Sequence, residues 1–239
     1  MSRLFKVLCL ALACASLCIF ASSCGSSNSQ VRVVQTISDA PVAFDVNISG
    51  RTIATNVGFP SVSPGSGYTS VSSGSDSFEL FTTGTTTSPL IQTTLNMGGS
   101  KQYTVIVTGF YAGSSGANAP TAVLLTDNNT TPTTNNAAFR VVDASPSAPT
   151  SLDIYLVPPG TNIVPISPNF AGLTFQQASP YITMAAATYQ LIVTTSGSKI
   201  PLISEAYTVS AGQIRTLVLI NVQNGGSLAP LPVELSDLN

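Results

Sequence analysis

The chain has no histidine and no tryptophan, and few of its side chains carry a charge. Without histidine, Ser-His-Asp and Cys-His catalysis and histidine-ligated zinc sites are excluded. Neither of the standard glycine-rich phosphate loops occurs either, which argues against nucleotide chemistry. Charged residues make up 8% of the 239 residues, whereas about 25% is usual for a soluble domain. The surface must therefore be built from Ser, Thr, Asn, Gln and Gly, which is typical of exported β-proteins.

Positive charge and cysteine are especially scarce. Eight Lys and Arg residues stand against ten Asp and Glu residues, which gives a formal net charge of −2. No basic patch is available to hold a phosphate backbone, so nucleic acid is not expected as a partner. The four cysteines all lie in the first 24 residues, and cleavage before Cys24 would leave one cysteine and no intramolecular disulfide. The folded part must then be held together by packing alone.

The N-terminus has the layout of a secretory signal peptide. Two basic residues, Arg3 and Lys6, precede an apolar run from Val7 to Phe20 and a short stretch of small residues. The run has about 14 residues, whereas a membrane-spanning helix needs about 20. We therefore predict a signal peptide over residues 1–23 and no permanent span there.

The end of this segment, Ala21-Ser22-Ser23-Cys24, resembles the lipobox of bacterial lipoproteins. In that family the cysteine carries diacylglycerol and its new amino group is acylated, for example with palmitate, which anchors the protein firmly. The resemblance implies lipidation of Cys24, a membrane as partner through this lipid, and a place in the cell envelope outside the cytoplasm. Gly25 is not the aspartate that retains such lipoproteins in the inner membrane, which favours the outer membrane where a cell has one. Residues 24–30 are then a flexible tether.

Two alternatives to this interpretation stay open. Ala21 stands where leucine is usual in the lipobox, and Ala11-Leu12-Ala13-Cys14 is a rival site with only a very short apolar segment before it. An ordinary cleaved signal peptide with an incidental cysteine is the second alternative.

An internal repeat organises the rest of the chain. Its clearest feature is Val31-Arg32-Val33-Val34, which recurs as Phe139-Arg140-Val141-Val142. The other matched segments are Ala40-Pro41 with Ala148-Pro149, Phe44-Asp45-Val46 with Leu152-Asp153-Ile154, Tyr68 with Tyr181, Phe78-Glu79-Leu80 with Tyr189-Gln190-Leu191, Pro89-Leu90 with Pro201-Leu202, and Thr104-Val105-Ile106 with Thr216-Leu217-Val218. We predict two homologous units, residues 31–127 and 138–239, joined by a linker at 128–137 that leaves them limited freedom.

The pattern within each unit is that of short strands. Apolar residues at Val42, Phe44, Val46 and Ile48 alternate with Ala43, Asp45 and Asn47. The runs Gln102–Phe110 and Ile214–Val222 are more continuously apolar, as expected of central strands buried on both faces. Gly and Pro clusters recur about every 8–12 residues, and no long stretch has a helical period. The sequence thus predicts an all-β chain of two tandem immunoglobulin-like antiparallel β-sandwiches after a signal peptide.

A family resemblance agrees with this fold. The Val-Arg-Val-Val strand, the turn with Ala-Pro, the strand that contains Asp, and the segment Gly99–Val105 resemble DUF4397, a domain of unknown function. The resemblance covers about Val31 to Leu235 as two copies. It implies an extracytoplasmic β-sandwich lipoprotein and brings no catalytic residue with it.

One segment has a catalytic form. Ser196-Gly197-Ser198-Lys199 fits the Ser-x-x-Lys nucleophile motif of penicillin-binding enzymes, in which a helix places the lysine next to the serine. Here the segment lies between two strand-like runs, contains a glycine and lacks the partner motifs of that family. A hairpin turn is the expected structure, and no catalytic residue is predicted. A Ser-Lys enzyme stays a lesser alternative.

The aspartates provide two further candidate sites. A glycosidase needs two carboxylates roughly 5–10 Å apart. The candidates by residue type are Asp39, Asp45, Asp127, Asp143 and Asp153. Asp45 and Asp153 are equivalent in the repeat. Arg32 and Arg140 are equivalent too, so we expect instead a surface Arg–Asp pair that bridges neighbouring strands in each unit. Asp127-Asn128-Asn129 offers oxygen ligands for calcium, but these residues are also usual in turns, and we predict no metal site and no cofactor.

The tether, the duplicated unit and the missing catalytic chemistry favour a non-enzymatic binding or adhesion protein. A cell-wall glycan or an envelope protein is the expected partner. Exposed aromatic rings would favour a glycan, because such rings stack on sugars. The tyrosines available are Tyr68, Tyr103, Tyr111, Tyr155, Tyr181, Tyr189 and Tyr207. The alternative is a structural subunit of a cell-envelope complex, and a carbohydrate-active enzyme is a lesser one.

Overall fold

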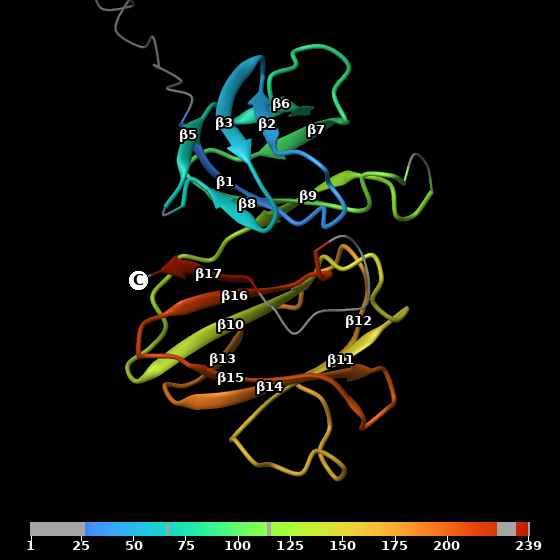
Figure 1. The fold of residues 1–239 in the computed structure, drawn as a ribbon. Coiled ribbons are helices and arrows are strands. Elements are labelled where there is room, and N and C mark those ends of the chain that lie inside the picture. The colour runs from blue at the N-terminus through green and yellow to red at the C-terminus, as the bar shows by residue number, and fades with distance from the viewer. Residues whose placement is uncertain (1–26, 66, 114–115, 224–232, 239) are drawn as a thin grey trace, which may run out of the picture.

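The computed structural model describes residues 27–65, 67–113, 116–223 and 233–238 of the chain. This part consists of strands and connecting turns and contains no helix, as the sequence predicted. Two β-sandwich units lie one above the other, and the chain passes between them after Thr126 and before Asn136 (Figure 1). We refer to strands β1 to β9 as unit 1 and to strands β10 to β17 as unit 2.

Each unit consists of two sheets. In unit 1 the first sheet has the order β4-β1-β8-β9, with β5 also paired to β1, and the second has the order β3-β2-β6-β7. The first sheet contains β1 (Ser29–Gln35), β4 (Ser61–Ser63), β5 (Thr69–Val71), β8 (Gln102–Thr108) and β9 (Thr121–Thr126). The second sheet contains β2 (Phe44–Ile48), β3 (Arg51–Val57), β6 (Gly74–Thr82) and β7 (Ile91–Met97).

Unit 2 has the same arrangement. Its first sheet has the order β13-β10-β16-β17 and its second the order β12-β11-β14-β15. The first sheet contains β10 (Asn136–Asp143), β13 (Ile182–Ala185), β16 (Ile214–Leu219) and β17 (Val233–Leu238). The second sheet contains β11 (Leu152–Val157), β12 (Phe170–Leu173), β14 (Thr188–Thr195) and β15 (Pro201–Thr208).

The sheets are mixed rather than wholly antiparallel. In unit 1 the strands β1 and β8 pair in parallel, and in unit 2 the strands β10 and β16 do the same. The expectation of antiparallel sheets is therefore wrong for these two ladders. Parallel neighbours need a long crossover connection, and the whole second sheet of each unit lies between the paired strands in the sequence and provides it.

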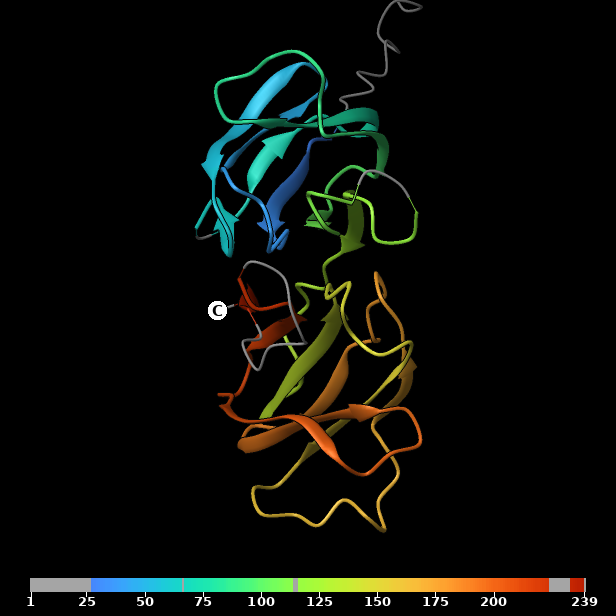
Figure 2. The same ribbon diagram turned by 45° about the vertical axis from the view of Figure 1, so that its right-hand side comes forward.

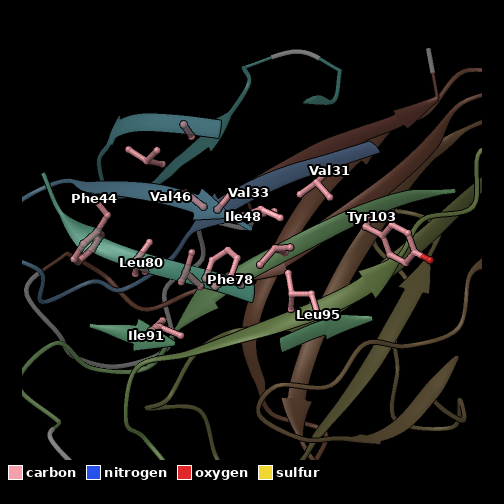
Figure 3. Packing of buried hydrophobic residues seen from close by; sticks show 14 of the residues in the cluster. Val31, Val33, Phe44, Val46, Ile48, Phe78, Leu80, Ile91, Leu95 and Tyr103 are labelled. Carbon is pink, nitrogen blue, oxygen red and sulfur yellow. The ribbon is translucent and has the colours of Figure 1, made fainter. Parts of the chain in front are cut away.

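Alternation along the strands places apolar side chains between the two sheets of each unit. In β2 the side chains of Phe44, Val46 and Ile48 are buried, while the polar residues between them are partly exposed, as the period of two predicted. Phe78 and Leu80 of β6 complete this part of the core, and the side chains are seen together in Figure 3. Unit 2 has a separate core between its own two sheets.

Strand registers correct one part of the predicted repeat. Val46 lies opposite Leu80 in the ladder of β2 and β6, and its equivalent Ile154 lies opposite Val193 in the ladder of β11 and β14. Leu80 therefore corresponds to Val193, and the predicted match of Phe78-Glu79-Leu80 with Tyr189-Gln190-Leu191 is wrong by two residues. A slip of two leaves every side chain on the same face of its strand, so the apolar pattern alone cannot detect it.

A third apolar cluster lies between the units. The first sheets of the two units face each other, as both ribbon views show (Figures 1 and 2). Val34 and Ile106 of unit 1 pack with Val142, Val218 and Leu235 of unit 2. We refer to this contact between the two first sheets as the junction.

The junction explains the two-sided burial of the central strands. Residues on both faces of β8 and β16 are buried, which confirms the prediction for Gln102–Phe110 and Ile214–Val222. One face lies against the unit's own second sheet and the other against the opposite unit. In this structure the facing sheets of the two units are packed together, whereas limited freedom between the units was predicted.

Unit 2 buries a carboxylate that has no counterpart in unit 1. Asp143 at the end of β10 is fully buried, and its Oδ1 accepts a hydrogen bond of 2.9 Å from the backbone N–H of Ser145. Its Oδ2 has no hydrogen-bond partner among the described residues. Burial raises the pKa of Asp143 to about 7, although the Ser145 N–H acts in the opposite direction. The equivalent residue in unit 1 is the neutral Gln35, which accepts a bond from Ile37 in the same way.

We predict that Asp143→Asn stabilises the protein, and that its advantage over the wild type increases as the pH rises from about 4 to about 7. Because the pKa of Asp143 rises from 3.8 to about 7 on folding, the wild type loses stability as the pH rises from the lower value to the higher one. Each pKa unit corresponds to about 1.4 kcal/mol. The advantage of the variant over the wild type should therefore grow by about 4 kcal/mol between pH ~4 and pH ~8. Urea unfolding at both pH values measures it, and an advantage that does not change with pH would contradict the prediction.

Candidate functional site

Four charged side chains meet at the junction. Arg32 lies on β1, Arg140 on β10, Asp127 directly after β9 and Asp237 on β17. The arginine side chains are 4% exposed and the aspartate side chains 0% exposed. We refer to these four residues as the charge cluster.

The closest ion pairs cross from one unit to the other. Nη2 of Arg140 lies 2.6 Å from Oδ1 of Asp127, and Arg32 forms a direct ion pair with Asp237. The other two contacts are longer, 3.4 Å between Arg32 and Asp127 and 3.8 Å between Arg140 and Asp237. Each arginine is therefore held most closely by an aspartate that belongs to the opposite half of the chain.

Hydroxyl groups of both units complete the charge cluster. Oδ2 of Asp127 accepts hydrogen bonds from the hydroxyls of Tyr68 at 2.8 Å and Thr104 at 2.6 Å. Oδ2 of Asp237 accepts the equivalent bonds from the hydroxyls of Tyr181 at 2.8 Å and Thr216 at 2.6 Å. The guanidinium of Arg32 lies over the ring of Tyr68 at 5.0 Å, and that of Arg140 over the ring of Tyr181 at 4.6 Å. Such contacts add cation–π attraction to the ion pairs. Each of these contacts made by a residue of unit 1 has an equivalent contact made by the matched residue of unit 2. The charge cluster and its surroundings are therefore symmetric between the two units.

The environment holds these groups in fixed protonation states. Burial alone would lower the pKa of Arg32, but the nearby carboxylates of Asp237 and Asp127 outweigh it and raise that pKa. Burial also raises the pKa of Tyr68 and of Tyr181 well above the ordinary value of tyrosine. Near neutral pH the arginine is therefore charged, and both tyrosines stay neutral hydrogen-bond donors.

This arrangement is able to couple the two units mechanically. The carboxylate oxygens are inaccessible and already accept bonds from arginine and hydroxyl groups, so a substrate has no route to them. Breaking a buried ion pair by removing one partner costs about 3–5 kcal/mol, because the other charge is left without compensation. Separating the units would expose every such pair at once.

The expected surface pairs of Arg32 with Asp45 and of Arg140 with Asp153 do not form, and this prediction is wrong. Asp45 and Asp153 instead hold turns through backbone N–H groups. The donors are Asn56 and Gly84 to Asp45 at 2.8 and 3.1 Å, and Gly172 and Gly197 to Asp153 at 3.1 and 2.9 Å. Although burial acts in the opposite direction, these bonds lower the pKa of both aspartates. The aspartates lie on the second sheets, whereas Arg32 and Arg140 lie on the first sheets and face the junction.

The side chains of Asp127, Asn128 and Asn129 bind other groups of the protein and do not form a calcium site among themselves. The carboxylate of Asp127 belongs to the charge cluster, and the side-chain N–H of Asn129 donates to the backbone carbonyl of Asp237. The side-chain oxygen of Asn128 accepts from the backbone N–H of Thr130 at 3.0 Å. Within the described ranges, no group of three or more His, Cys, Asp or Glu residues could hold a metal ion.

The Ser-x-x-Lys segment forms the predicted turn between β14 and β15. The hydroxyl of Ser196 donates to Asp153 at 3.0 Å. Lys199 donates to the hydroxyl of Tyr155 at 2.8 Å and to the backbone carbonyl of Ile166. The serine and the lysine therefore have different partners, and the hydrogen bond between them that the catalytic motif needs is not formed.

The tyrosines do not form a sugar-stacking surface. Tyr103 and Tyr155 are buried, and the other five are partly buried, Tyr68 and Tyr181 of them in contact with the charge cluster. None of the seven is exposed. A glycan site built on a pair of exposed tyrosine rings is therefore not supported.

The predicted lipidation site, Cys24, lies outside the residues that the structure describes and stays a prediction. Over the described ranges, no helix has the length and apolar character needed to cross a membrane. The first described strand, β1, begins at Ser29, so Ser29 and Gln30 belong to a sheet, and the predicted flexible tether over residues 24–30 is wrong at these two residues.

A polar cleft opens beside the charge cluster. Its volume is about 580 Å³, within the usual range of small-ligand sites. Its walls come from Asn28 and Gln30 at the start of β1, residues 100–102 before and at the start of β8, and residues 127–130 after β9. All of these residues are polar or charged. Asp127 thus belongs both to the charge cluster and to the floor of the cleft.

The sequence analysis missed the aspartates as partners of the arginines. Asp127 was considered only as a candidate catalytic carboxylate and as a calcium ligand, and Asp237 was not considered at all. A signal was present, because Leu125-Thr126-Asp127 matches Leu235-Ser236-Asp237. The two aspartates also lie 23 and 21 residues after the equivalent threonines, Thr104 and Thr216.

We predict that Arg140→Ala lowers the free energy of unfolding by about 3–5 kcal/mol, because Asp127 loses its closest counter-ion in a buried site. Arg51→Ala is the matched control, since Arg51 on β3 is an exposed arginine, and its effect should stay within about 0.5 kcal/mol. Equilibrium unfolding in urea compares the two variants. Equal effects would show that the charge cluster does not hold the units together.

Comparison with known structures gives only weak likenesses. The Bacillus anthracis TIE protein is 8% identical with a TM-score of 0.26, and the match covers 81% of this chain and 34% of that one. The CBM26 module CBMbc of Eubacterium rectale Amy13K in complex with maltoheptaose is 14% identical with a TM-score of 0.27, covering 85% and 97%. A leucine-rich repeat protein from Bacteroides thetaiotaomicron is 14% identical with a TM-score of 0.21, covering 84% and 27%. These likenesses are too weak to indicate a function.

Comparison with protein families is more informative. No curated protein matches the chain. The family "Domain of unknown function (DUF4397)" matches residues 29–155, which is more than half of the chain. The match contains all of unit 1 and continues through β10 into β11. The chain therefore belongs to the DUF4397 family.

Proposed function

We propose that the chain is a lipid-anchored protein of the cell envelope whose two β-sandwich units form one stiff, non-enzymatic binding module. The lipid is carried by Cys24, and unit 2 is a second copy of the family's domain. The main support for the proposal is the charge cluster. Its ion pairs join the two units, and they engage Asp127 and Asp237, so these carboxylates are not free to act in catalysis.

The proposed second copy rests on topology and on the charge cluster. Unit 2 has the strand order of unit 1, including the parallel pairing of its first strand. The contacts of Arg32 with Thr104 on the adjacent strand recur between Arg140 and Thr216. Equivalent contacts at equivalent positions are expected when one unit arose by duplication of the other.

The non-enzymatic part of the proposal rests on the engagement of the reactive side chains. Asp45 and Asp153 hold turns, and Asp39 accepts the backbone N–H groups of Tyr111 and Ala112 at 2.7 and 3.1 Å. Ser196 and Lys199 are fixed within a hairpin turn and its neighbours. These contacts supply a structural role for the three aspartates, the serine and the lysine.

A structural subunit of an envelope complex is the second candidate, and one feature of unit 2 favours it. Val164 and Ile200 are 65% and 76% exposed. They lie in two neighbouring turns, which the bond from Lys199 to the carbonyl of Ile166 connects. A protein partner would remove these side chains from water. Crosslinking in intact envelopes would be reduced by Val164→Ser and Ile200→Ser if this candidate is correct.

We predict that the full chain incorporates labelled palmitate in cells and that Cys24→Ser abolishes the label. The thiol is the atom to which the lipid is joined, so the serine variant should leave the detergent phase on phase partition. Cys14→Ser is the matched control and should keep both the label and the partition. Loss of label in the control alone would place the lipid on the rival site instead.

The proposed binding role is tested by a pull-down of residues 29–239, which contain every described strand, on purified sacculi and insoluble polysaccharides. Saturable binding to one material, competed by its soluble fragments, would support a glycan-binding module. Absence of binding to all of them would contradict a glycan ligand, and crosslinking in the intact envelope would then decide for a protein partner.

A further inference from the structure

We propose that the polar cleft binds the anionic, hydroxyl-rich headgroup of a lipid in the membrane that carries the protein. The proposal rests on the proposed lipid anchor and names a ligand class for the cleft. The chemistry required is a phosphate with neighbouring hydroxyl groups, as in phosphatidylglycerol.

The place of the cleft along the chain is the first argument. Asn28 forms part of its wall, and four residue steps separate it from the proposed lipid on Cys24. An extended chain advances at most about 3.6 Å per residue, so the cleft cannot lie more than about 14 Å from the lipid-bearing residue. A lipid anchor would therefore keep the cleft within reach of the headgroups at every moment.

The charge of the cleft is the second argument. Two charged residues line it, Lys101 and Asp127. The carboxylate of Asp127 is wholly buried and neutralised by Arg140 and Arg32, so it does not repel an anion. Lys101 is exposed and takes part in no ion pair among the described residues. The cleft therefore presents a positive charge although the chain as a whole is negative.

The remaining lining is suited to hydroxyl groups. The side-chain N–H of Gln102 donates to the side-chain oxygen of Gln30 at 2.7 Å. This leaves the amide group of Gln30 as a donor and the carbonyl of Gln102 as an additional acceptor, since each amide side chain carries both functions. No apolar or aromatic side chain lines the cleft. The ligand must therefore bind through hydrogen bonds and charge, which excludes acyl chains and stacked sugar rings.

The backbone makes these walls rigid. The N–H of Gln30 donates to the carbonyl of Lys101 at 2.9 Å, and the N–H of Ser100 donates to the carbonyl of Asn28 at 2.9 Å. The third wall is held through Asn129, whose side chain donates to the backbone of Asp237 in unit 2. Groups fixed in this way lose little freedom when a ligand binds.

The experiment uses the full, lipid-anchored chain in nanodiscs and the reactivity of its lysines. Lys101 and Lys199 are the lysines that follow Cys24. A water-soluble acylating reagent modifies both, and mass spectrometry gives the two rates. One set of nanodiscs is phosphatidylcholine alone, and the other contains roughly one quarter phosphatidylglycerol. We expect Lys101 to react at least about threefold more slowly when phosphatidylglycerol is present. A threefold decrease corresponds to occupation of about two thirds of the clefts. The rate at Lys199 should stay constant.

Variants separate binding in the cleft from the general effect of an anionic surface. Gln102→Ala and Gln30→Ala each remove hydrogen-bonding groups from the cleft without changing its charge, and both should abolish the protection of Lys101. Gln92→Ala on β7 is the matched control at an exposed position, and it should keep the protection. The rate at Lys199 reports that each variant is folded, because that side chain is held by Tyr155 and Ile166.

Each outcome supports or overturns the proposal. Equal rates at Lys101 in the two sets of nanodiscs would overturn it, as would protection that persists in both cleft variants. Protection by soluble glycerol 3-phosphate in discs of phosphatidylcholine alone would support the same chemistry with a free source of the ligand. Failure of the lipid anchor appears differently, because the protein would then not elute with the discs at all.

Discussion

Buried charge at the junction is the constraint on which the rest of the structure depends. Arg32 and Arg140 project from the first sheets into a contact where water cannot solvate them. Isolated charges are very costly in such a place unless they are paired. The closest counter-ions are Asp237 and Asp127, each contributed by the opposite half of the chain. While the units are packed together, each arginine is therefore satisfied mainly by a carboxylate of the opposite unit.

Apolar packing and the charge cluster reinforce each other. The apolar side chains at the junction, among them Val34 and Val218, bring the sheets close enough for the ion pairs to form. The ion pairs then fix one relative position, since a guanidinium and a carboxylate pair only in a narrow geometry. This combination explains why β8 and β16 are buried on both faces. In a unit on its own, the apolar side chains that face the junction would be exposed to water.

The proposed repeat was visible in the sequence because matched positions keep the same residue types. The matched pairs Arg32 and Arg140, Tyr68 and Tyr181, and Thr104 and Thr216 make equivalent contacts, because the arginines belong to the charge cluster and the tyrosines and threonines contact it. Their partners could not be predicted in the same way. Equivalence shows that two positions have the same role, but it does not show which aspartate lies across a contact between units.

Other features depend on geometry that residue patterns do not encode. The parallel pairing of β1 with β8 follows from the path of the whole unit, since both strands have patterns that fit an antiparallel ladder equally well. The polar cleft combines three segments that are far apart in the sequence. Each segment taken alone has the composition of an ordinary polar turn. Lys101 becomes part of a cleft only because the fold brings the three segments together near the predicted tether.

Coupling of the units also helps to fix the position of the residues that line the cleft. Asp127 is shared between the charge cluster and the floor of the cleft, and Asn129 connects that floor to unit 2. A loosened junction would therefore alter the cleft even without a change in its own lining. The cleft and the second unit therefore belong to one body, to which the proposed anchor would be joined.

Native-state hydrogen exchange tests the central claim most directly, because it follows both units in the unmodified chain. If the charge cluster couples the units, the slowest backbone amides of β8 and of β16 should exchange with the same free energy of opening and the same dependence on urea. Two distinct free energies, with one unit opening while the other stays closed, would contradict the account.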